Sequence, residues 1–440
     1  MGSAESLTSI AKIVKSYKGK QVVVVSAMSG ITNDLLWATD AALSGKRSKV
    51  KKIIAEILQR HTGTINSFVS DPVIKQELIQ YTEKVLQDIS SFLKAIDAIG
   101  ELSVRSQDMI MAVGERLSSR MLAGILTDQG CPAEQLDLEK VIPDKFENPD
   151  QRFFLFTEKT FSSSIRKVLN RKKIPVLTGY FGYVPGGMLA KVGRGYSDFC
   201  ASLAAAGLKA KELEIWTDVS GLYTADPRKI KRAKIVPKVS CAAAAELAHF
   251  GAKVIHPQSI HPATRIGIPV WIKNTFEPKA KGTEIVSAVK NSKDFFVAVT
   301  SKKGQTIVNI ASYRMLLQYG FLARIFNTFA KYKVPIDVVS TSEVSVSVSI
   351  ENTNHLQEII TELKPVSKIV VEQKKAIVCL VTSGVKNKQG VAGELFSTIA
   401  KADISAEMIS VGASEINLTF LVDENKADKA VEVLHRKFFE

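Results

Sequence analysis

The pattern of apolar positions divides the chain into an α/β part and a later part with a different character. Four short apolar runs bounded by Gly, Ser or Thr have the length and composition of buried parallel strands. They lie at residues 21–26, 174–178, 213–216 and 268–272. Helical patterns fill the intervals between them. The first 290 residues or so are therefore predicted to form an α/β sandwich with a mainly parallel sheet.

Residues 36–107 carry the helical pattern almost without interruption, and Pro72 is placed to open one of the helices. We interpret this region as an insertion of helices over the edge of the sheet.

Beyond Pro278 two segments repeat 70 positions apart. In the first copy, Leu322, Ile325, Phe326 and Phe329 follow the spacing of one helix face, and residues 344–350 alternate as in a half-buried strand. Each copy reads strand, helix, strand, strand, helix, and a final strand follows the first copy near residues 369–371. This order predicts ferredoxin-like βαββαβ units, which either bind a small ligand where they pair or serve only in dimerisation. The repeated positions are Gly320, Phe326, Thr328, Ala330, Lys331 and Ser340, matched by Gly390, Phe396, Thr398, Ala400, Lys401 and Ser410, with Asp337 answered by Glu407.

Composition is that of a soluble globular protein, with 45% hydrophobic and 23% charged residues in 440. The formal net charge of +15 allows a nucleic acid partner, but no aromatic-interleaved RNA signature or zinc-finger spacing accompanies it. Solvated surfaces and attraction of anionic metabolites explain the charge better, so no nucleic acid or membrane partner is expected. The chain shows no long apolar stretch and no secretory signal, which predicts a cytoplasmic protein. The scattered cysteines are interpreted as buried thiols: Cys131, Cys200, Cys241 and Cys379.

Polar residues with binding chemistry follow the predicted strands, where α/β folds hold their ligands. Neither a P-loop nor a Gly-x-Gly-x-x-Gly fingerprint is present, so phosphate must be held by glycine-bearing loops backed by basic side chains. Candidate loops are Ser29-Gly30 and residues 193–195. Lys253, Arg228 and a Mg²⁺ ion would supply positive charge for phosphoryl transfer, while Asp198 or Asp218 orients the acceptor or holds the metal indirectly.

Several of these residues have plainer interpretations. From spacing alone, Glu115 is better read as an exposed helix carboxylate, and Thr32 could be only a helix cap. His249, His256 and His261 have no metal-ligand spacing, and packing or capping roles are preferred for them.

Taken together, residues 26–33, 114–115, 193–198, 216–228, 250–257 and 320–343 resemble the aspartate kinase family in the right order along nearly the whole chain. The resemblance implies an amino acid kinase-like three-layer α/β sandwich with a mainly parallel central sheet, followed by two ferredoxin-like βαββαβ ACT domains. The implied boundaries are 1–290 for the catalytic domain and 296–371 and 372–440 for the ACT domains. The implied reaction transfers the γ-phosphoryl of ATP, with Mg²⁺, to L-aspartate, giving 4-phospho-L-aspartate at the entry to lysine, threonine, methionine and diaminopimelate synthesis.

The resemblance also assigns roles to individual residues. Glu115 and Arg194 would hold the amino and carboxylate groups of aspartate, completed by Thr32, Ser197 and Asp198, with Asp198 and Lys253 counted as catalytic. The nucleotide site would be lined by Thr217, Asp218, Tyr223, Asp226, Arg228 and Lys253. The ACT pair implies a homodimer and feedback by an end-product amino acid, with lysine favoured and threonine left open. The residues matching that effector site are Met315, Gly320, Leu322, Asp337, Thr341 and Ser342.

Two departures from the family pattern accompany this resemblance. The family begins with a strand ending in Lys-Phe-Gly-Gly-Thr-Ser, whereas this sequence opens at Met1-Gly2-Ser3-Ala4-Glu5, which corresponds to the residues directly after that motif. A start assigned too far downstream is the favoured explanation, and a catalytically impaired amino-acid sensor is the alternative. The second departure is Tyr196, where the family usually has glycine.

Overall fold

The computed structural model describes residues 4–140, 149–182, 184–192, 195–251, 254–289, 295–315, 319–383, 388–411 and 416–440. The chain forms two compact units, each made of two stretches of sequence. The first unit consists of Met1–Ser220 and His256–Lys281, and the second of Gly221–Ile255 and Gly282–Glu440.

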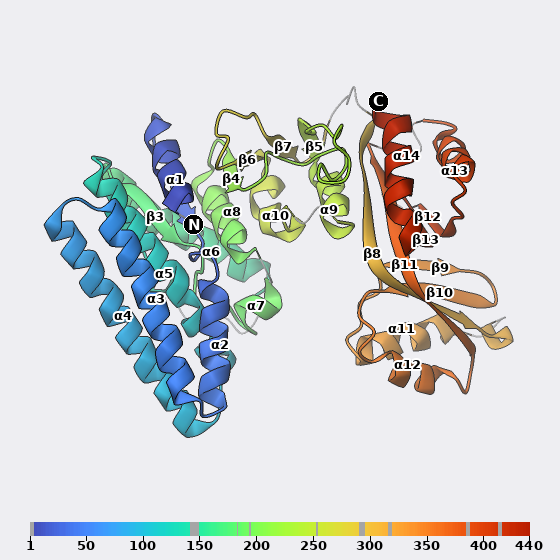
Figure 1. Cartoon of the computed structure of the whole chain (residues 1–440), viewed down its shortest axis with the longest axis horizontal. Coiled ribbons are helices and arrows are strands. Elements are labelled where there is room, and N and C mark those ends of the chain that lie inside the picture. Colours follow the sequence, from blue (N-terminus) through green and yellow to red (C-terminus); the bar gives the residue numbers. More distant parts are fainter. Residues whose placement is uncertain are drawn as a thin grey trace. The chain divides into compact units, whose positions relative to one another are not determined.

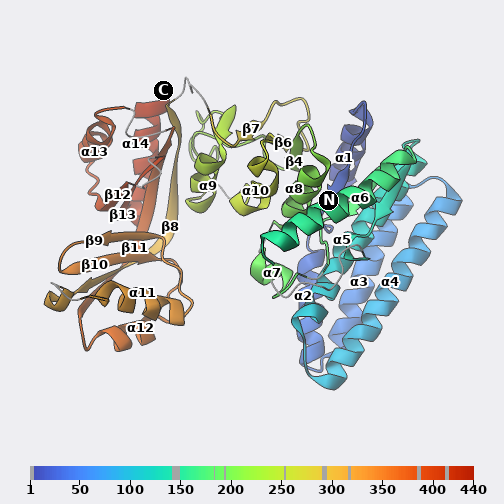
Figure 2. The same ribbon diagram turned by 180° about the vertical axis from the view of Figure 1, so that it is seen from behind.

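Four long helices in the first unit, α2 to α5, lie side by side in both views (Figure 1, Figure 2). Their apolar faces meet in a core that includes the fully buried Leu35 and Ile57. Pro72 opens α4, and the Asp71 carboxylate before it caps the helix by accepting hydrogen bonds from two backbone amides of the first turn. The predicted helical region and the role of Pro72 are confirmed. The bounds are α2 Ile31–Leu43, α3 Arg47–Phe68, α4 Pro72–Ile99 and α5 Val104–Asp128.

All strands of the first unit pair in parallel, as the continuous apolar runs predict. Strands β1, β3 and β2 form one sheet in that order, and β4 pairs with β6 in another. The four strands expected from the sequence are therefore confirmed, although they fall into two sheets instead of one central sheet. The bounds are β1 Val23–Val25, β2 Ala133–Leu136, β3 Ile174–Thr178, β4 Leu213–Thr217 and β6 Val270–Asn274. The remaining helices are α1 Ala4–Ser16, η1 Leu138–Lys140, α6 Gln151–Asn170, α7 Met188–Lys191, α8 Tyr196–Leu208 and α10 Pro257–Arg265.

The second unit is organised around a six-stranded antiparallel sheet with the order β12-β13-β11-β8-β10-β9. Strands β8 and β11 are long and pair along most of their length, from Lys368 opposite Ala311 to Thr382 opposite Phe296. The elements of this sheet are β8 Phe296–Ala311, η2 Tyr313–Met315, α11 Phe321–Lys331, β9 Val338–Thr341, β10 Ser345–Ile350, α12 Leu356–Leu363, β11 Lys368–Thr382, α13 Val391–Lys401, β12 Glu407–Val411, β13 Asn417–Asp423, η4 Glu424–Lys426 and α14 Ala427–Phe439. Three further elements belong to this unit: β5 Lys238–Ser240, α9 Cys241–His249 and β7 Thr283–Val286.

Both repeats contribute to this single sheet. The second half of β8 pairs with β10 and the start of β11, which completes the first βαββαβ copy. The first half of β8 pairs with the second half of β11, so it supplies the fourth strand, the last of the six elements, that the second copy lacks in its own segment. Residues 296–302 therefore lie in the half of the sheet built by the second copy. The predicted domain boundary between residues 371 and 372 falls within β11, which is continuous through both halves of the sheet.

The amphipathic patterns of the first copy are largely confirmed. In β10, Val346, Val348 and Ile350 are fully buried. In α11, Ile325 and Phe329 are buried against the sheet, whereas Leu322 is 42% exposed, so the prediction that Leu322 belongs to the buried face is wrong. Leu322 is the second residue of this short helix, and in its first turn the buried side chain is that of the neighbouring Phe321.

The thiols are only partly as expected, because Cys200 and Cys379 are buried while Cys131 and Cys241 are half-buried. None of the described helices combines the length and the apolar character needed to cross a membrane.

Candidate functional site

The loop that follows β1 is fixed by the residues around Gly30. Gly30 has a φ of 84° and takes the N-cap position of α2, so Thr32 lies inside the helix and its interpretation as the cap is wrong. Arg60 on α3 holds the loop from outside, because its guanidinium donates to the Ser29 carbonyl at 2.5 Å and pairs with Asp34 at 3.3 Å. Arg60 thereby links α3 to both the loop after β1 and the first turn of α2.

Glu115 is completely buried in the middle of α5, so its interpretation as an exposed helix carboxylate is wrong. The preceding Gly114 explains how the helix comes so close to the loop after β1. A Cβ atom at Gly114 would lie 2.6 Å from the Cβ of Ala27, which is far inside normal contact distance. Glycine at this position therefore brings the Glu115 carboxylate against the end of β1.

The Glu115 carboxylate has no hydrogen-bond partner of normal geometry among the described residues. Burial raises its pKa from 4.5 to about 7, an effect moderated by the backbone of Ala27 and by the hydroxyl of Tyr196. A buried carboxylate with both oxygens unpaired is costly unless a cationic ligand compensates for it. Among the described residues of the first unit, Glu115 is therefore a strong candidate for binding a cationic group.

Ser197 and Asp198 lie in the first turn of α8, whose N-cap is Gly195 with a φ of 96°. Ser197 packs against Gly179 after β3, where a Cβ atom would lie 2.5 Å from the Ser197 hydroxyl. Burial raises the pKa of Asp198 to about 6. Thr32, Glu115, Ser197 and Asp198 thus come from α2, α5 and α8, at the carboxyl ends of β1 and β3 where parallel sheets hold ligands.

Thr217 and Asp218 follow β4 directly and belong to the first unit. The Thr217 hydroxyl donates to the Asp218 carboxylate at 3.1 Å, and the Thr217 carbonyl accepts from the Thr275 amide at 2.8 Å. Ser220 closes the turn by donating to Glu277 at 3.0 Å while it accepts from Asn274 at 2.9 Å. The turn after β4 is thus tied to the turn after β6.

The other predicted nucleotide residues belong to the second unit. Arg228 forms a two-pronged ion pair with Asp226, with distances of 3.0 Å and 2.8 Å, and it lowers the pKa of that carboxyl. Tyr223 is joined to Ile235 by an antiparallel bridge, which closes the loop between them. Because these residues and Thr217 lie in different units, their common nucleotide site stays a prediction. Arg194 and Lys253 lie outside the described residues.

Asp337 is the predicted effector residue with the most distinctive surroundings. Its carboxylate is 7% exposed and pairs with Lys302 at 2.8 Å and with His249 at 3.3 Å. Burial alone would raise the pKa of Asp337, but His249 and Lys302 outweigh it and hold that pKa below its ordinary value. His249 lies in the last turn of α9 and its ring meets that of Phe250 edge to face, so the expected packing role is confirmed, and the contact with Asp337 is additional to it. His256 occupies the N-cap of α10 without a side-chain hydrogen bond to it, and His261 is exposed.

The remaining effector candidates also belong to the first repeat. Gly320 is the N-cap of α11 with a φ of 82°, and Met315 packs at the edge of the same core. Thr341 ends β9, and the Ser342 hydroxyl accepts from the Ser345 amide at 3.1 Å, which shapes the turn into β10. The structure thus places these candidates at the helix start and the strand end of one ACT copy, with Leu322 exposed beside them.

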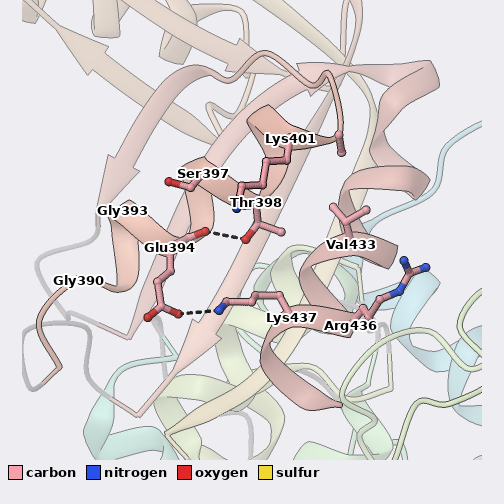
Figure 3. A pocket seen from close by; sticks show the side chains of 10 residues that line it. Gly390, Gly393, Glu394, Ser397, Thr398, Lys401, Val433, Arg436 and Lys437 are labelled. Carbon is pink, nitrogen blue, oxygen red and sulfur yellow. Dashed lines mark hydrogen bonds and ion pairs between the residues drawn. The ribbon is translucent and has the colours of Figure 1, made fainter.

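An open hollow of about 670 Å³ lies between α13 and α14 (Figure 3). Two of its charged side chains pair with each other, Glu394 with Lys437 at 3.5 Å, and the lining residue Arg436 pairs with Glu432 outside the hollow at 2.8 Å. None of its lining residues is a predicted site residue. It has the character of a solvated surface groove. In the part of the chain that the structure describes, no group of three or more His, Cys, Asp or Glu is arranged to hold a metal ion.

Comparison with known proteins agrees with this geometry. Residues 1–274 match the amino acid kinase family, and residues 378–438 match the ACT domain. The aspartokinase of Schizosaccharomyces pombe is 37% identical over 93% of this chain and 84% of its own length. The structure of Escherichia coli aspartokinase III in complex with lysine and aspartate has a TM-score of 0.80 at 30% identity, covering 100% of this chain and 98% of that one. The same enzyme in complex with aspartate and ADP gives a TM-score of 0.77 at 29% identity, with coverage of 100% and 99%.

The parallel α/β unit and the ACT sheet therefore define an amino acid kinase that carries an ACT regulatory region. Within that class, the sequence identity to aspartokinases over nearly the full length of the chain indicates which molecule accepts the phosphoryl group. The chain belongs to the aspartate kinase family, whose members are phosphotransferases acting on aspartate.

Proposed function

We propose that Glu115 binds the amino group of L-aspartate and that Arg194 binds a carboxylate of it, with Thr32, Ser197 and Asp198 completing the pocket. The observation that carries this assignment is the buried Glu115 carboxylate, both oxygens of which are left without a hydrogen bond in the described structure. An ammonium group is the ligand that such a carboxylate lacks. The aspartate bound by the Escherichia coli neighbour supports the same substrate.

Calorimetric titration with L-aspartate tests this assignment without depending on turnover. Glu115→Gln should weaken aspartate binding at least about 100-fold, because a buried charged pair is replaced by a neutral contact. Glu83→Gln is the matched control, since Glu83 is exposed on the neighbouring helix α4. Equal affinities of the two variants would remove Glu115 from the substrate site.

The ATP site is proposed to comprise Thr217, Asp218, Tyr223, Asp226, Arg228 and Lys253. The ADP-bound Escherichia coli neighbour supports a nucleotide in this family. Mg²⁺ in kinases is bound through one or two carboxylates and the substrate phosphates, so it needs no cage of protein ligands. Asp198 and Asp218 are carboxylates of the right chemistry for that role, and the ion would neutralise charge on the phosphates.

The proposed mechanism is one of positioning and charge compensation. Phosphoryl transfer requires the acceptor carboxylate in line with the γ-phosphate and positive charge around the transferring group. Glu115 and Arg194 orient aspartate from its α-carbon, which leaves the side-chain carboxylate as the nucleophile. Lys253 and Arg228 face the phosphates. The product is 4-phospho-L-aspartate.

Feedback control by lysine is proposed for the first ACT copy, at Met315, Gly320, Leu322, Asp337, Thr341 and Ser342. The lysine bound by the Escherichia coli neighbour supports an effector of this class. The reaction then opens the cytoplasmic route to lysine, threonine, methionine and diaminopimelate. Exposed apolar side chains on β9 and β12, namely Val339, Ile409 and Val411, favour a homodimer formed through the ACT sheets. Inhibition curves with lysine and threonine, and sedimentation of the purified protein, test these points.

A further inference from the structure

Two acidic residues on one helix are connected through a pair of buried tyrosines. Asp108 and Glu115 both lie on α5, seven positions apart and therefore two turns apart on the same face. Asp108 is 3% exposed and accepts a short hydrogen bond from the Tyr180 hydroxyl. The Tyr180 ring meets the Tyr196 ring edge to face, with centroids 5.0 Å apart and planes at 69°. The Tyr196 hydroxyl faces Glu115 and Thr32.

Asp108 is fixed by more than Tyr180. Each of its carboxylate oxygens accepts from the Met188 amide at 3.2 Å, at the start of α7. This contact ties α5 to the segment that leads toward residues 193–195. The Tyr180 and Tyr196 rings are both at least nine-tenths buried, so neither can turn away without opening the core. The two tyrosines therefore have one arrangement available, and that arrangement aims a phenol at Glu115.

We propose that Tyr196 is a positioning residue whose hydroxyl orients the Glu115 carboxylate toward the amino group of L-aspartate, and that Asp108 and Tyr180 hold the Tyr196 ring in place. The inference rests on the proposed assignment of Glu115 to the substrate. It gives a role to the position where glycine is usual in the family. A glycine there could not supply the hydroxyl, and the carboxylate would depend on backbone groups alone.

The electrostatics agree with this arrangement. Among the described residues, Tyr180, Tyr196 and Cys200 are titratable groups that interact with Glu115, and burial raises the pKa of each, so all three are neutral at physiological pH. The neutral Tyr196 phenol lies close enough to Glu115 to favour the ionised carboxylate and lower its pKa, in opposition to burial, although the two groups do not meet in the geometry of a regular hydrogen bond. The hydroxyl thus helps to keep Glu115 charged for a cationic ligand.

Tyr196→Phe tests the proposal, because it removes one oxygen and keeps the ring. We expect the KM for aspartate to rise about 10-fold, the value of one hydrogen bond to a charged group, while the KM for ATP and kcat change less than about twofold. We also expect the acidic limb of the pH profile of kcat/KM for aspartate to move to higher pH, since Glu115 without the phenol takes up a proton more readily. Calorimetric affinity for aspartate should fall by the same factor.

Two comparisons separate this role from a structural one. Asp108→Asn weakens the anchor of Tyr180 and should reproduce part of the Tyr196→Phe effect on aspartate KM and on the pH limb. Tyr332→Phe removes a phenol that donates to Glu362 at 3.2 Å in the second unit and should change neither. An unchanged aspartate KM and pH limb in Tyr196→Phe would overturn the proposal, as would a fall in kcat and melting temperature with both KM values unaltered. If Glu115→Gln itself left aspartate binding intact, the substrate assignment would fail instead.

Discussion

Thr224 and His435 share a hydrogen bond of 3.0 Å between Oγ1 and Nε2, although 211 positions separate them in the chain. Thr224 lies between the predicted nucleotide residues Tyr223 and Asp226, and His435 lies on α14 of the second ACT copy. Ala225 is buried in the core beneath that helix. A loop predicted to bind ATP is therefore joined directly to α14 of the ACT sheet, so we expect changes in α14 to affect the predicted nucleotide residues.

Asp428 strengthens this connection and offers a test of it. Its carboxylate accepts from Lys229 of the loop and from Lys303 after the first half of β8, both at 2.7 Å. Asp428→Asn should raise the KM for ATP about threefold, since a partly exposed ion pair is worth up to ~1 kcal/mol, and should leave the KM for aspartate unchanged. Initial rates measure both constants.

Asp403→Asn is the control for that measurement. The Asp403 side chain is fully exposed in the same ACT copy, and its carboxylate forms a distant pair with Lys426 at 3.7 Å. Asparagine also tolerates its φ of 58°. If Asp428→Asn behaved like Asp403→Asn, the loop would not depend on α14 for its conformation.

Asp337 should be required for feedback but not for basal turnover. Its carboxylate joins Lys302 of β8 to His249 at the end of α9, two residues before Gly251 and the predicted phosphate-facing segment. An effector ammonium would compete with the Lys302 ammonium for the same carboxylate. Asp337→Asn should raise the lysine concentration for half-inhibition at least about 10-fold, because coupling between remote sites is a separable free energy.

The second repeat supplies a matched control for the inhibition curve. Glu407 corresponds to Asp337, and Lys375 pairs with it at 2.8 Å in place of Lys302. Glu407→Gln should therefore leave the lysine dependence as it is. An identical loss of inhibition in both variants would show that a carboxylate at this position supports the ACT fold in general and does not mark the effector site.

The stability of the protein should depend on pH through Glu115. The folded-state pKa of about 7 lies above the ordinary 4.5, so this group contributes most to stability below pH 4.5 and loses that contribution as the pH rises through 7. The difference between these values corresponds to on the order of 3 kcal/mol. Glu115→Gln should thus become more stable relative to the unmodified protein between pH 4.5 and 8, as measured by urea unfolding, while it loses aspartate binding.

Asp128, at the end of the same helix, should show the opposite dependence. Backbone amides of Ser70 and Asp71 donate to its carboxylate and hold its pKa below 3.8. Its contribution is present above that value and is lost as the pH falls through the lower folded-state pKa. Asp128→Asn should be destabilised at neutral pH and approach the unmodified protein in acid. The same pH trend in both variants would contradict the burial cost assigned to Glu115.

The sequence predicts the framework of this protein better than its site, for a physical reason. A strand buried on both faces, such as β3, is a continuous apolar run, and Pro72 starts a helix through its own fixed φ, so both can be read locally. The surroundings of Glu115 include Ala27 and Tyr196, which are distant from it in the chain and carry no spacing signal. The spacing of Asp108 and Glu115 on one helix face, next to Gly114, is the signal that could have indicated a buried acidic pair.

The absence of a side chain at Gly114 allows α5 to approach the loop after β1, and this approach positions Glu115. A Cβ there would lie 2.6 Å from Ala27 Cβ and 3.4 Å from Ile31 Cγ2, and the Ala27 atom is attached directly to backbone that cannot swing away. Gly114→Ala should therefore force α5 away from β1, destabilising the fold by about 1–3 kcal/mol and weakening aspartate binding through a displaced Glu115. Gly63→Ala, on α3 with nothing within 4 Å of the new atom, should stabilise the protein by up to about 1 kcal/mol through helix propensity. Thermal unfolding and aspartate titration compare the two variants. If the Gly114→Ala protein were as stable as the Gly63→Ala protein and bound aspartate as tightly, the approach of α5 to β1 would not set the position of Glu115.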